Sequence, residues 1–187
     1  MNYDAIRPLF GGKLTQAQVD GIEKILSACK VLTDERHIAY ILATCFHETA
    51  KTMQPVRENG RGKGLPYGSK LKMGGGPGHR VPYTNPDQLY YGRGYVQLTW
   101  YENYLAMGRK LHIDLLNNPD LALQPDISAK IMITGMTDGS FTGKKLSDYF
   151  NNKTNDPVNA RRIINGTDVA ATIAGYHNTF LKAITAS

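Results

Sequence analysis

The chain has few cysteines, no long apolar run and no run of like charges, and each absence excludes a class of protein. Its only cysteines, Cys29 and Cys45, are too few for a disulfide framework and lack companions at metal-ligand spacing. Both lie among apolar residues of expected helices, so we predict two buried thiols that act as small hydrophobic side chains. The sequence therefore predicts neither a disulfide nor a metal site.

The apolar stretches are all shorter than the roughly 20 residues that cross a bilayer, which predicts no stable membrane insertion. Residues Met1–Asp4 also lack the basic region and apolar core of a secretory signal. We therefore expect synthesis in a cytoplasm without signal-dependent export.

Lysine and arginine number 22 against 16 acidic residues, which gives a formal charge of +6 and a pI near 9.3. A basic protein favours an anionic partner, such as nucleic acid, an anionic membrane or an anionic cell wall. The basic residues are scattered rather than gathered in a stripe, so we expect no nucleic-acid partner. A basic surface that only keeps the protein soluble fits the charge equally well.

Two N-terminal helices are marked by apolar stripes, and the first also by a cap. Thr15 opens the first with a capping box, because Gln18 lies three residues on and can reach back to the Thr15 amide. The second begins near Asp34, and at roughly 100° per residue Glu48 falls about 90° from the centre of its stripe. Glu48 is therefore expected at the margin between core and solvent, in the last turn of the helix. The stripe consists of Ile38, Ile41, Leu42, Cys45 and Phe46.

From Gln54 to about Tyr83 the helical pattern stops, and glycines alternate with prolines. A long stretch without periodicity in a compact domain is either functional or disordered. Its position directly after Glu48 favours a functional cleft segment, with a short hairpin in it at most.

The C-terminal half again predicts helices, and Asp168 is placed to cap the last of them. The chain is thus mainly α. Its length fits a single domain over residues 1–187, or a larger lobe with a smaller one folded against it. The helices before the last are expected from Trp100 to Leu111, from Pro125, over Leu146–Phe150 and over Val158–Ile164.

Two glutamates suit the chemistry of glycoside hydrolysis, which requires one protonated carboxyl as proton donor and one ionised carboxyl as base or nucleophile. Glu48, at the edge of an apolar stripe, suits the acid. Glu58, beside Arg57 on a glycine-rich loop, suits the ionised partner. The pair alone is weak evidence, because a glutamate on a helix margin is usually a solvated surface residue.

Several sequence blocks in a fixed order resemble glycoside hydrolase family 19, which contains plant chitinases and a branch of bacteriophage endolysins. The most specific block is Tyr91–Thr99, with its glycine-arginine-glycine segment followed by Gln-Leu-Thr. The resemblance covers most of the chain from residue 37 onwards. The blocks are Phe46–Ala50, Glu58, Tyr91–Thr99, Asn103–Tyr104, Asn117–Leu121 and Ile163–Gly166.

This resemblance implies a lysozyme-like fold of two lobes and a single displacement that inverts the anomeric carbon. It implies that Glu48 is the general acid, that Glu58 is the general base and that Thr99 helps to hold the attacking water. Inversion predicts carboxyls roughly 6.5–9.5 Å apart, which leaves room for that water. The residues expected to bind substrate amides or to orient the acids are Gln97, Asn103 and Asn165.

Arg93 and Tyr91 are further candidates for substrate binding. Arg93 could instead hold a catalytic carboxylate or brace the backbone between its two glycines. Aromatic faces pack on sugar rings, but we expect about half of the aromatic side chains in this region to be core. They are Tyr67, Tyr83, Tyr90, Tyr91, Tyr95, Trp100, Tyr101 and Tyr104.

The chain departs from plant-type chitinases in lacking their disulfides and a secretion signal, and in its shorter interval between Glu48 and the second acid. The shorter interval keeps Asp87 and Glu102 as alternatives for the base. The compact form is more similar to the phage endolysins of the family, which hydrolyse β-1,4 bonds between the amino sugars of peptidoglycan.

We therefore expect a monomer that needs no cofactor, is made in a host bacterial cytoplasm and acts on the wall after release. A chitinase that uses the same residues and a non-catalytic wall-binding module are the alternatives.

Overall fold

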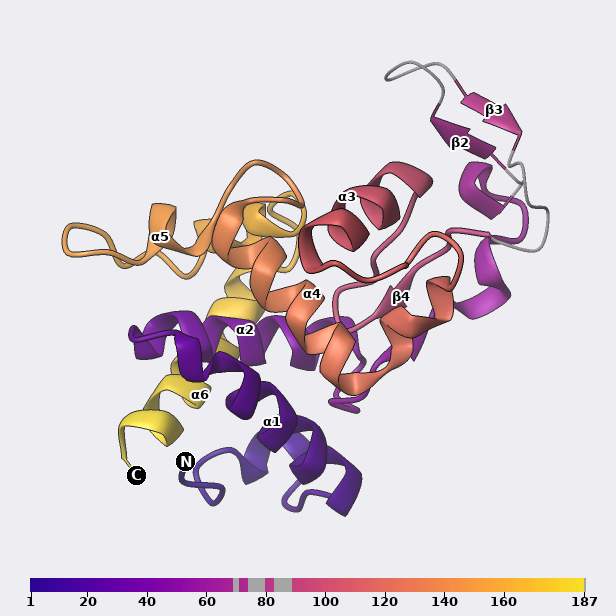
Figure 1. The fold of residues 1–187 in the computed structure, drawn as a ribbon. Helices are drawn as coiled ribbons and strands as arrows, with labels where there is room; N and C mark the ends of the chain where they lie inside the picture. The colour runs from indigo at the N-terminus through magenta and orange to yellow at the C-terminus, as the bar shows by residue number, and fades with distance from the viewer. Residues whose placement is uncertain (69–70, 74–79, 83–88, 187) are drawn as a thin grey trace. The chain divides into compact units, whose positions relative to one another are not determined.

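The computed structural model describes residues 1–68, 71–73, 80–82 and 89–186. The chain folds as two compact units: residues 1–54 with 132–187, and residues 55–131. Figure 1 shows the chain leaving the first unit after α2 (Glu35–Glu48) and returning to it within α4 (Pro125–Asp138). In the described part of the chain, no helix has the length and apolar character needed to cross a membrane.

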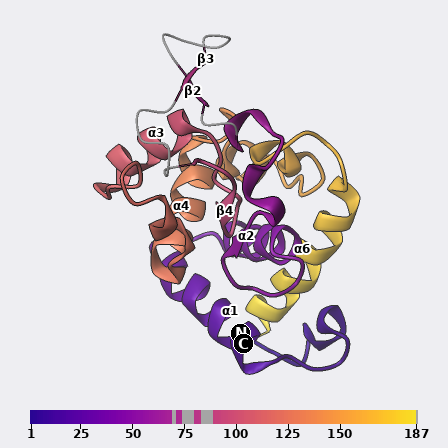
Figure 2. The same cartoon turned by 90° about the vertical axis from the view of Figure 1, so that its right-hand side faces the viewer.

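The first unit is helical and is built around α2. Its central residues, from Ala39 to Phe46, are all buried, and α2 packs along α6 (Ala170–Thr185), as Figure 2 shows. The Phe46 ring contacts the rings of Phe10 and Tyr176, with centroids 4.9 and 4.8 Å away. Its other elements are α1 (Gln16–Ala28), α5 (Leu146–Tyr149), and the short 3-10 helices η1 (Arg7–Phe10), η2 (Cys29–Val31) and η6 (Asn159–Ile163).

The local signals at the first two helices are confirmed. Thr15 caps α1 with the full capping box, in which its hydroxyl accepts from the Gln18 amide and the Gln18 side chain accepts from the Thr15 amide. The Asp34 carboxylate accepts from the Arg36 amide at 2.9 Å and caps α2. Cys29 and Cys45 are free and buried as predicted, and burial raises the pKa of both thiols.

The expected cap at Asp168 is wrong. Helix α6 begins at Ala170 after Val169, which adopts a left-handed φ of 50°, and no side chain caps the helix. The Asp168 carboxylate instead lies 3.6 Å from Nη2 of Arg161. Because Val169 in its left-handed conformation occupies the N-cap position, Asp168 lies one residue too early to cap the helix.

The second unit holds the β-structure and α3 (Tyr101–Leu111). Strand β1 (Val56–Arg57) pairs antiparallel with β4 (Arg93–Gly94), so that Arg57 lies opposite Arg93. The hairpin of β2 (Leu71–Met73) and β3 (Arg80–Pro82) lies in the glycine-rich segment, where a short hairpin was expected. The remaining elements are the 3-10 helices η3 (Asn59–Gly62), η4 (Pro66–Gly68) and η5 (Pro119–Leu123), after which α4 begins at Pro125 as predicted.

His177 occupies a buried position in the first unit. Its ring stacks on Phe150, with centroids 5.2 Å apart and an interplanar angle of 22°, and lies 5.8 Å from the ring of Tyr40. Burial lowers the pKa of His177 below its ordinary 6.5, and a hydrogen bond with Asn178 opposes this effect only in part. The ring is therefore neutral in the folded protein at neutral pH.

This burial predicts a pH-dependent stability. Because the unfolded chain holds the His177 proton more tightly than the folded chain does, stability is fully present above a pH of about 6.5 and falls as the pH drops toward the lowered pKa. A His177→Phe variant keeps an aromatic ring in the stack and should lose part of this acid sensitivity in urea unfolding. The exposed His112→Asn serves as the matched control. An unchanged pH slope in His177→Phe would contradict the assignment.

Candidate active site

The Glu58 carboxylate is held by two neutral donors within the second unit. Oε2 accepts from the amide of Gly92 at 2.9 Å, and Oε1 accepts from the hydroxyl of Tyr67 at 2.8 Å. The Glu58 amide in turn donates to the Gly92 carbonyl at 2.9 Å, continuing the pairing of β1 with β4. Backbone pairing thus fixes the chain at Glu58, and the two donors fix the direction of its side chain.

Tyr67 remains a donor over a wide pH range. Its burial, its hydrogen bond to Glu58 and the charge of Glu58 raise the pKa of the phenol to about 12. The Tyr67 ring also packs edge-on against Trp100, with centroids 5.0 Å apart. The phenol is therefore protonated at neutral pH and positioned by a second aromatic ring.

A side chain at residue 92 would crowd this arrangement. A Cβ atom there would lie 3.3 Å from Glu58 Oε2 and 2.7 Å from Gln97 Oε1. The second distance is shorter than real Cβ contacts, so a larger residue would displace Gln97 and crowd the carboxylate. Gly92 therefore allows Glu58 and Gln97 to approach the same stretch of backbone.

The residues expected around Glu58 form a short chain of hydrogen bonds. Gln97 donates through Nε2 to the carbonyls of Val56 at 2.9 Å and Gly94 at 3.3 Å. The hydroxyl of Thr99 donates to the Gln97 carbonyl at 2.7 Å, and the exposed Asn103 donates to the Thr99 carbonyl at 2.8 Å. The structure thus places Gln97 against the backbone that binds Glu58. Hydrogen bonds then link Thr99 to Gln97 and Asn103 to Thr99.

Arg93 braces the backbone, as one interpretation of its glycine-flanked position predicted. The buried guanidinium donates to the carbonyls of Leu89 and Tyr91 at 2.9 and 3.2 Å, and through Nε to Asp120 at 2.7 Å. It also lies over the Tyr91 ring, 3.7 Å from the centroid. The roles of Arg93 and Tyr91 in substrate binding stay predictions.

The aromatic side chains of this region divide between core and partly exposed positions, as expected. Tyr90, Tyr91, Tyr95 and Tyr104 are buried, whereas Tyr67, Trp100 and Tyr101 are partly exposed. Tyr83 lies outside the described residues.

In the first unit, Glu48 is the last residue of α2, and its side chain is 18% exposed, as its place on the helix margin predicted. Its Oε1 accepts from Nη1 of Arg161 at 2.6 Å. The Arg161 side chain is only 4% exposed and also donates to the Asp168 carbonyl at 3.4 Å. Asn165 follows on the same segment, and its amide donates to the Arg161 carbonyl at 3.0 Å.

The turn after Glu48 is anchored to α1. Three residues in it, Ala50, Lys51 and Met53, have positive φ angles, so the chain changes direction sharply. Gln18 donates to the Lys51 carbonyl at 3.0 Å, and Gln54 donates to the Ala17 carbonyl at 2.6 Å. These bonds hold the end of α2, and with it Glu48, against the neighbouring helix.

Only one of the alternatives for the base lies within the described residues. Glu102 lies in the first turn of α3, and Asp87 lies outside the described residues. The assignment of Glu58 as the base stays a prediction. Arg161 and Tyr67 were not anticipated as partners of the two glutamates, because Arg161 is 113 residues from Glu48 and Tyr67 belongs to the glycine-rich segment.

The contact between Tyr67 and Glu58 can be tested by titration. Replacing Glu58 with glutamine removes the negative charge that favours the protonated phenol, so the pKa of Tyr67 should fall below about 12. It should stay above the ordinary 10.0, because burial remains. Tyrosine ring carbon shifts in NMR spectra at pH about 11 would report the ionised fraction. The exposed Glu35→Gln should leave Tyr67 unchanged, and an equal Tyr67 response in both variants would refute the contact.

Comparisons with known proteins place the chain in a family. The family model of glycoside hydrolase family 19, chitinase class I, matches residues 19–141. An endochitinase of Persea americana is 36% identical over 103 residues, covering 52% of this chain and 31% of that protein. An inactive chitinase-like protein of Hevea brasiliensis is 35% identical over 92 residues, covering 48% of this chain and 29% of that protein. The chain thus spans about a third of the length of these relatives.

Solved structures show the same fold. Chitinase C from Streptomyces griseus HUT6037 superposes with a TM-score of 0.65 at 22% identity, covering 97% of this chain and 75% of that one. A bacterial family 19 chitinase superposes with a TM-score of 0.58 at 24% identity, covering 96% and 92%. The mainly α, lysozyme-like fold expected from the sequence is therefore confirmed. By the match of its family model over most of its length, the chain belongs to glycoside hydrolase family 19.

Proposed function

We propose that this protein hydrolyses β-1,4 glycosidic bonds between N-acetylated amino sugars, with bacterial peptidoglycan as its natural substrate. The observation that carries the proposal is the Glu58 carboxylate, held by the Gly92 amide and the Tyr67 hydroxyl next to Gln97. Family membership alone is not sufficient support, because one relative is named an inactive chitinase-like protein.

Glu58 is the general base in this mechanism. Both of its hydrogen bonds are accepted by carboxylate oxygens, as the ionised form requires. It removes a proton from a water molecule as the water oxygen attacks the anomeric carbon. The Thr99 hydroxyl, which donates to the Gln97 carbonyl, keeps its oxygen lone pairs available to accept a hydrogen bond from that water.

Glu48 is the general acid. Arg161 occupies Oε1, so the proton that Glu48 donates is assigned to Oε2. As the water attacks, the bond between the anomeric carbon and the glycosidic oxygen breaks, and this proton passes to the departing oxygen. The products are two shorter chains, one with a new reducing end, and no cofactor takes part.

The formal charge of +6 favours peptidoglycan over uncharged polymers, because a basic protein concentrates at an anionic wall. This attraction weakens as salt is added. In this proposal the protein acts as a monomeric endolysin, made in a host bacterial cytoplasm and released to the wall. Chitin is the second candidate substrate, and the names of the related endochitinases and of chitinase C favour it.

One experiment tests the chemistry and the substrate together. Wild-type protein and Glu48→Gln are incubated with purified peptidoglycan and with chitin oligomers, and the products are identified by mass and by reducing-end analysis. Glu48→Gln should lower the rate by about 10²–10⁴-fold, because an amide cannot protonate the leaving oxygen. Glu35→Gln, the same substitution at the exposed start of α2, is the matched control.

New reducing ends from peptidoglycan support the proposal, whereas cleavage of chitin alone selects the second candidate. Near-native activity in a folded Glu48→Gln protein would overturn the assignment of the acid. Circular dichroism verifies that each variant is folded.

A further inference from the structure

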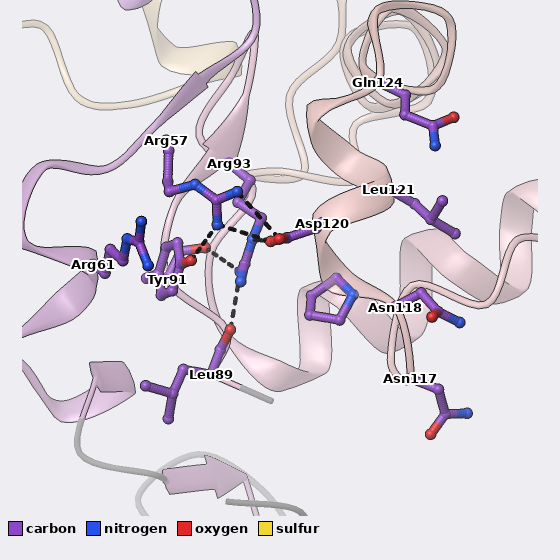
Figure 3. A pocket seen from close by; sticks show the side chains of 11 residues that line it. Arg57, Arg61, Leu89, Tyr91, Arg93, Asn117, Asn118, Asp120, Leu121 and Gln124 are labelled. Carbon is purple, nitrogen blue, oxygen red and sulfur yellow. Dashed lines mark hydrogen bonds and ion pairs between the residues drawn. The ribbon is translucent and has the colours of Figure 1, made fainter. Parts of the chain in front are cut away.

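A second polar site lies in the same unit as Glu58 but on the other side of β1. Adjacent residues of an extended segment point in opposite directions, and Arg57 contacts Tyr91 and Asp120 whereas its neighbour Glu58 contacts Tyr67 and Gly92. On the Arg57 side there is a pocket of about 610 Å³. Figure 3 shows the residues that line it.

The pocket carries a net positive charge. Three arginines line it, Arg57, Arg61 and Arg93, against the single carboxylate of Asp120. Figure 3 shows the guanidinium groups of Arg57 and Arg93 directed at this carboxylate, with contacts of 3.0 and 2.7 Å. Partial burial of Asp120 opposes ionisation, but the hydrogen bonds from the two arginines outweigh it and lower the pKa of the carboxyl. Asp120 is therefore ionised at neutral pH, and about two positive charges remain uncompensated.

Arg61 differs from the other two arginines of the pocket, because its charge does not contribute to holding the fold together. Its amide donates to the Glu58 carbonyl at 3.1 Å, but its exposed guanidinium has no hydrogen-bond or ion-pair partner among the residues that the structure describes. Its φ of 48° lies in the left-handed region, between Gly60 and Gly62, which also have positive φ. A left-handed backbone is unfavourable for a residue with a side chain. Because the guanidinium also has no partner among the described residues, a role in stabilising the fold does not explain an arginine at this position.

The opposite wall adds uncharged donors and apolar surface. The exposed side chains of Asn118 and Gln124 line the pocket, and neither has a partner within the described ranges. Leu89 and Leu121 provide apolar surface beside them, which strengthens nearby charge interactions by displacing water. Guanidinium and amide N–H groups around a concave site suit an oxyanion with several acceptor oxygens.

We propose that this pocket binds the oxyanion of an anionic glycan, either a carboxylate or a phosphate group. Arg61 makes the main charge-assisted contact, while Arg57 and Arg93, already neutralising Asp120, keep the pocket positive. The identity of the polymer rests on the proposed function, because peptidoglycan carries carboxylates on the peptides attached to its muramic acid residues, whereas chitin carries none. The site would hold the charged polymer at a distance from the bond that is cut.

Binding without turnover tests this proposal. N-acetylmuramic acid, inorganic phosphate and the neutral N-acetylglucosamine are titrated into the full chain, and amide shifts of Asn118, Leu121 and Gln124 are followed by NMR. The two sugars differ by the lactyl group and its carboxylate, so their comparison isolates the oxyanion. Saturable shifts with either anion, absent with the neutral sugar, support the proposal and identify the source of the oxyanion.

Variants of exposed basic residues locate the contact. Arg61→Gln should weaken anion binding about tenfold through the loss of one charge-assisted hydrogen bond, and Arg61→Lys should recover part of it. Lys63→Gln removes the same charge from the same loop, but Lys63 does not line the pocket, so its effect should be small. Equal losses in Arg61→Gln and Lys63→Gln, or equal shifts with the neutral sugar, would overturn the proposal.

The outcome is separable from that of the proposed function. Anion binding by a Glu48→Gln protein that cleaves no polymer would support the pocket while leaving the catalytic assignment to its own test. Polymer cleavage by a protein whose pocket shows no anion response would support the catalytic assignment and overturn the proposed anion site.

Discussion

The contact between Glu58 and residue 92 is the constraint on which the polar arrangement of the second unit depends. Glu58 both donates to the carbonyl and accepts from the amide of Gly92, so one residue supplies a strand-like pairing and a carboxylate partner. The pairing joins positions 34 residues apart. A side chain at position 92 would shift the Gln97 side chain and crowd the carboxylate.

Side chains of the short β1–β4 ladder alternate between its two sides, and the two sides have different roles. Glu58 and Gly92 form the arrangement that suits proton transfer, whereas Arg57 and Arg93 bind Asp120 and the ring of Tyr91. The buried guanidinium of Arg93, paired with Asp120 and with backbone carbonyls, makes the ladder rigid, because breaking one of its contacts leaves a desolvated charge. The chemistry on one side is therefore supported by electrostatics on the other.

Features with local causes could be predicted from the sequence. The capping box at Thr15, the start of α2 near Asp34 and the start of α4 at Pro125 each depend on neighbouring residues, and the apolar stripe of α2 placed Glu48 at the helix margin. Features that depend on distant partners could not be predicted from the sequence. Arg161 reaches Glu48 from 113 residues away. The cap expected at Asp168 also failed, because Val169 in a left-handed conformation occupies the N-cap position.

In the proposed mechanism, a water molecule activated by Glu58 attacks the sugar directly. A single displacement at a β-linked sugar forms the α anomer first, whereas attack by an enzyme carboxylate and later hydrolysis would restore the β anomer. Proton NMR of the product in the first minutes, before the anomers equilibrate, distinguishes the two. Direct attack by water should give the α anomer as the first product, and a β anomer would contradict the role of Glu58 as a base.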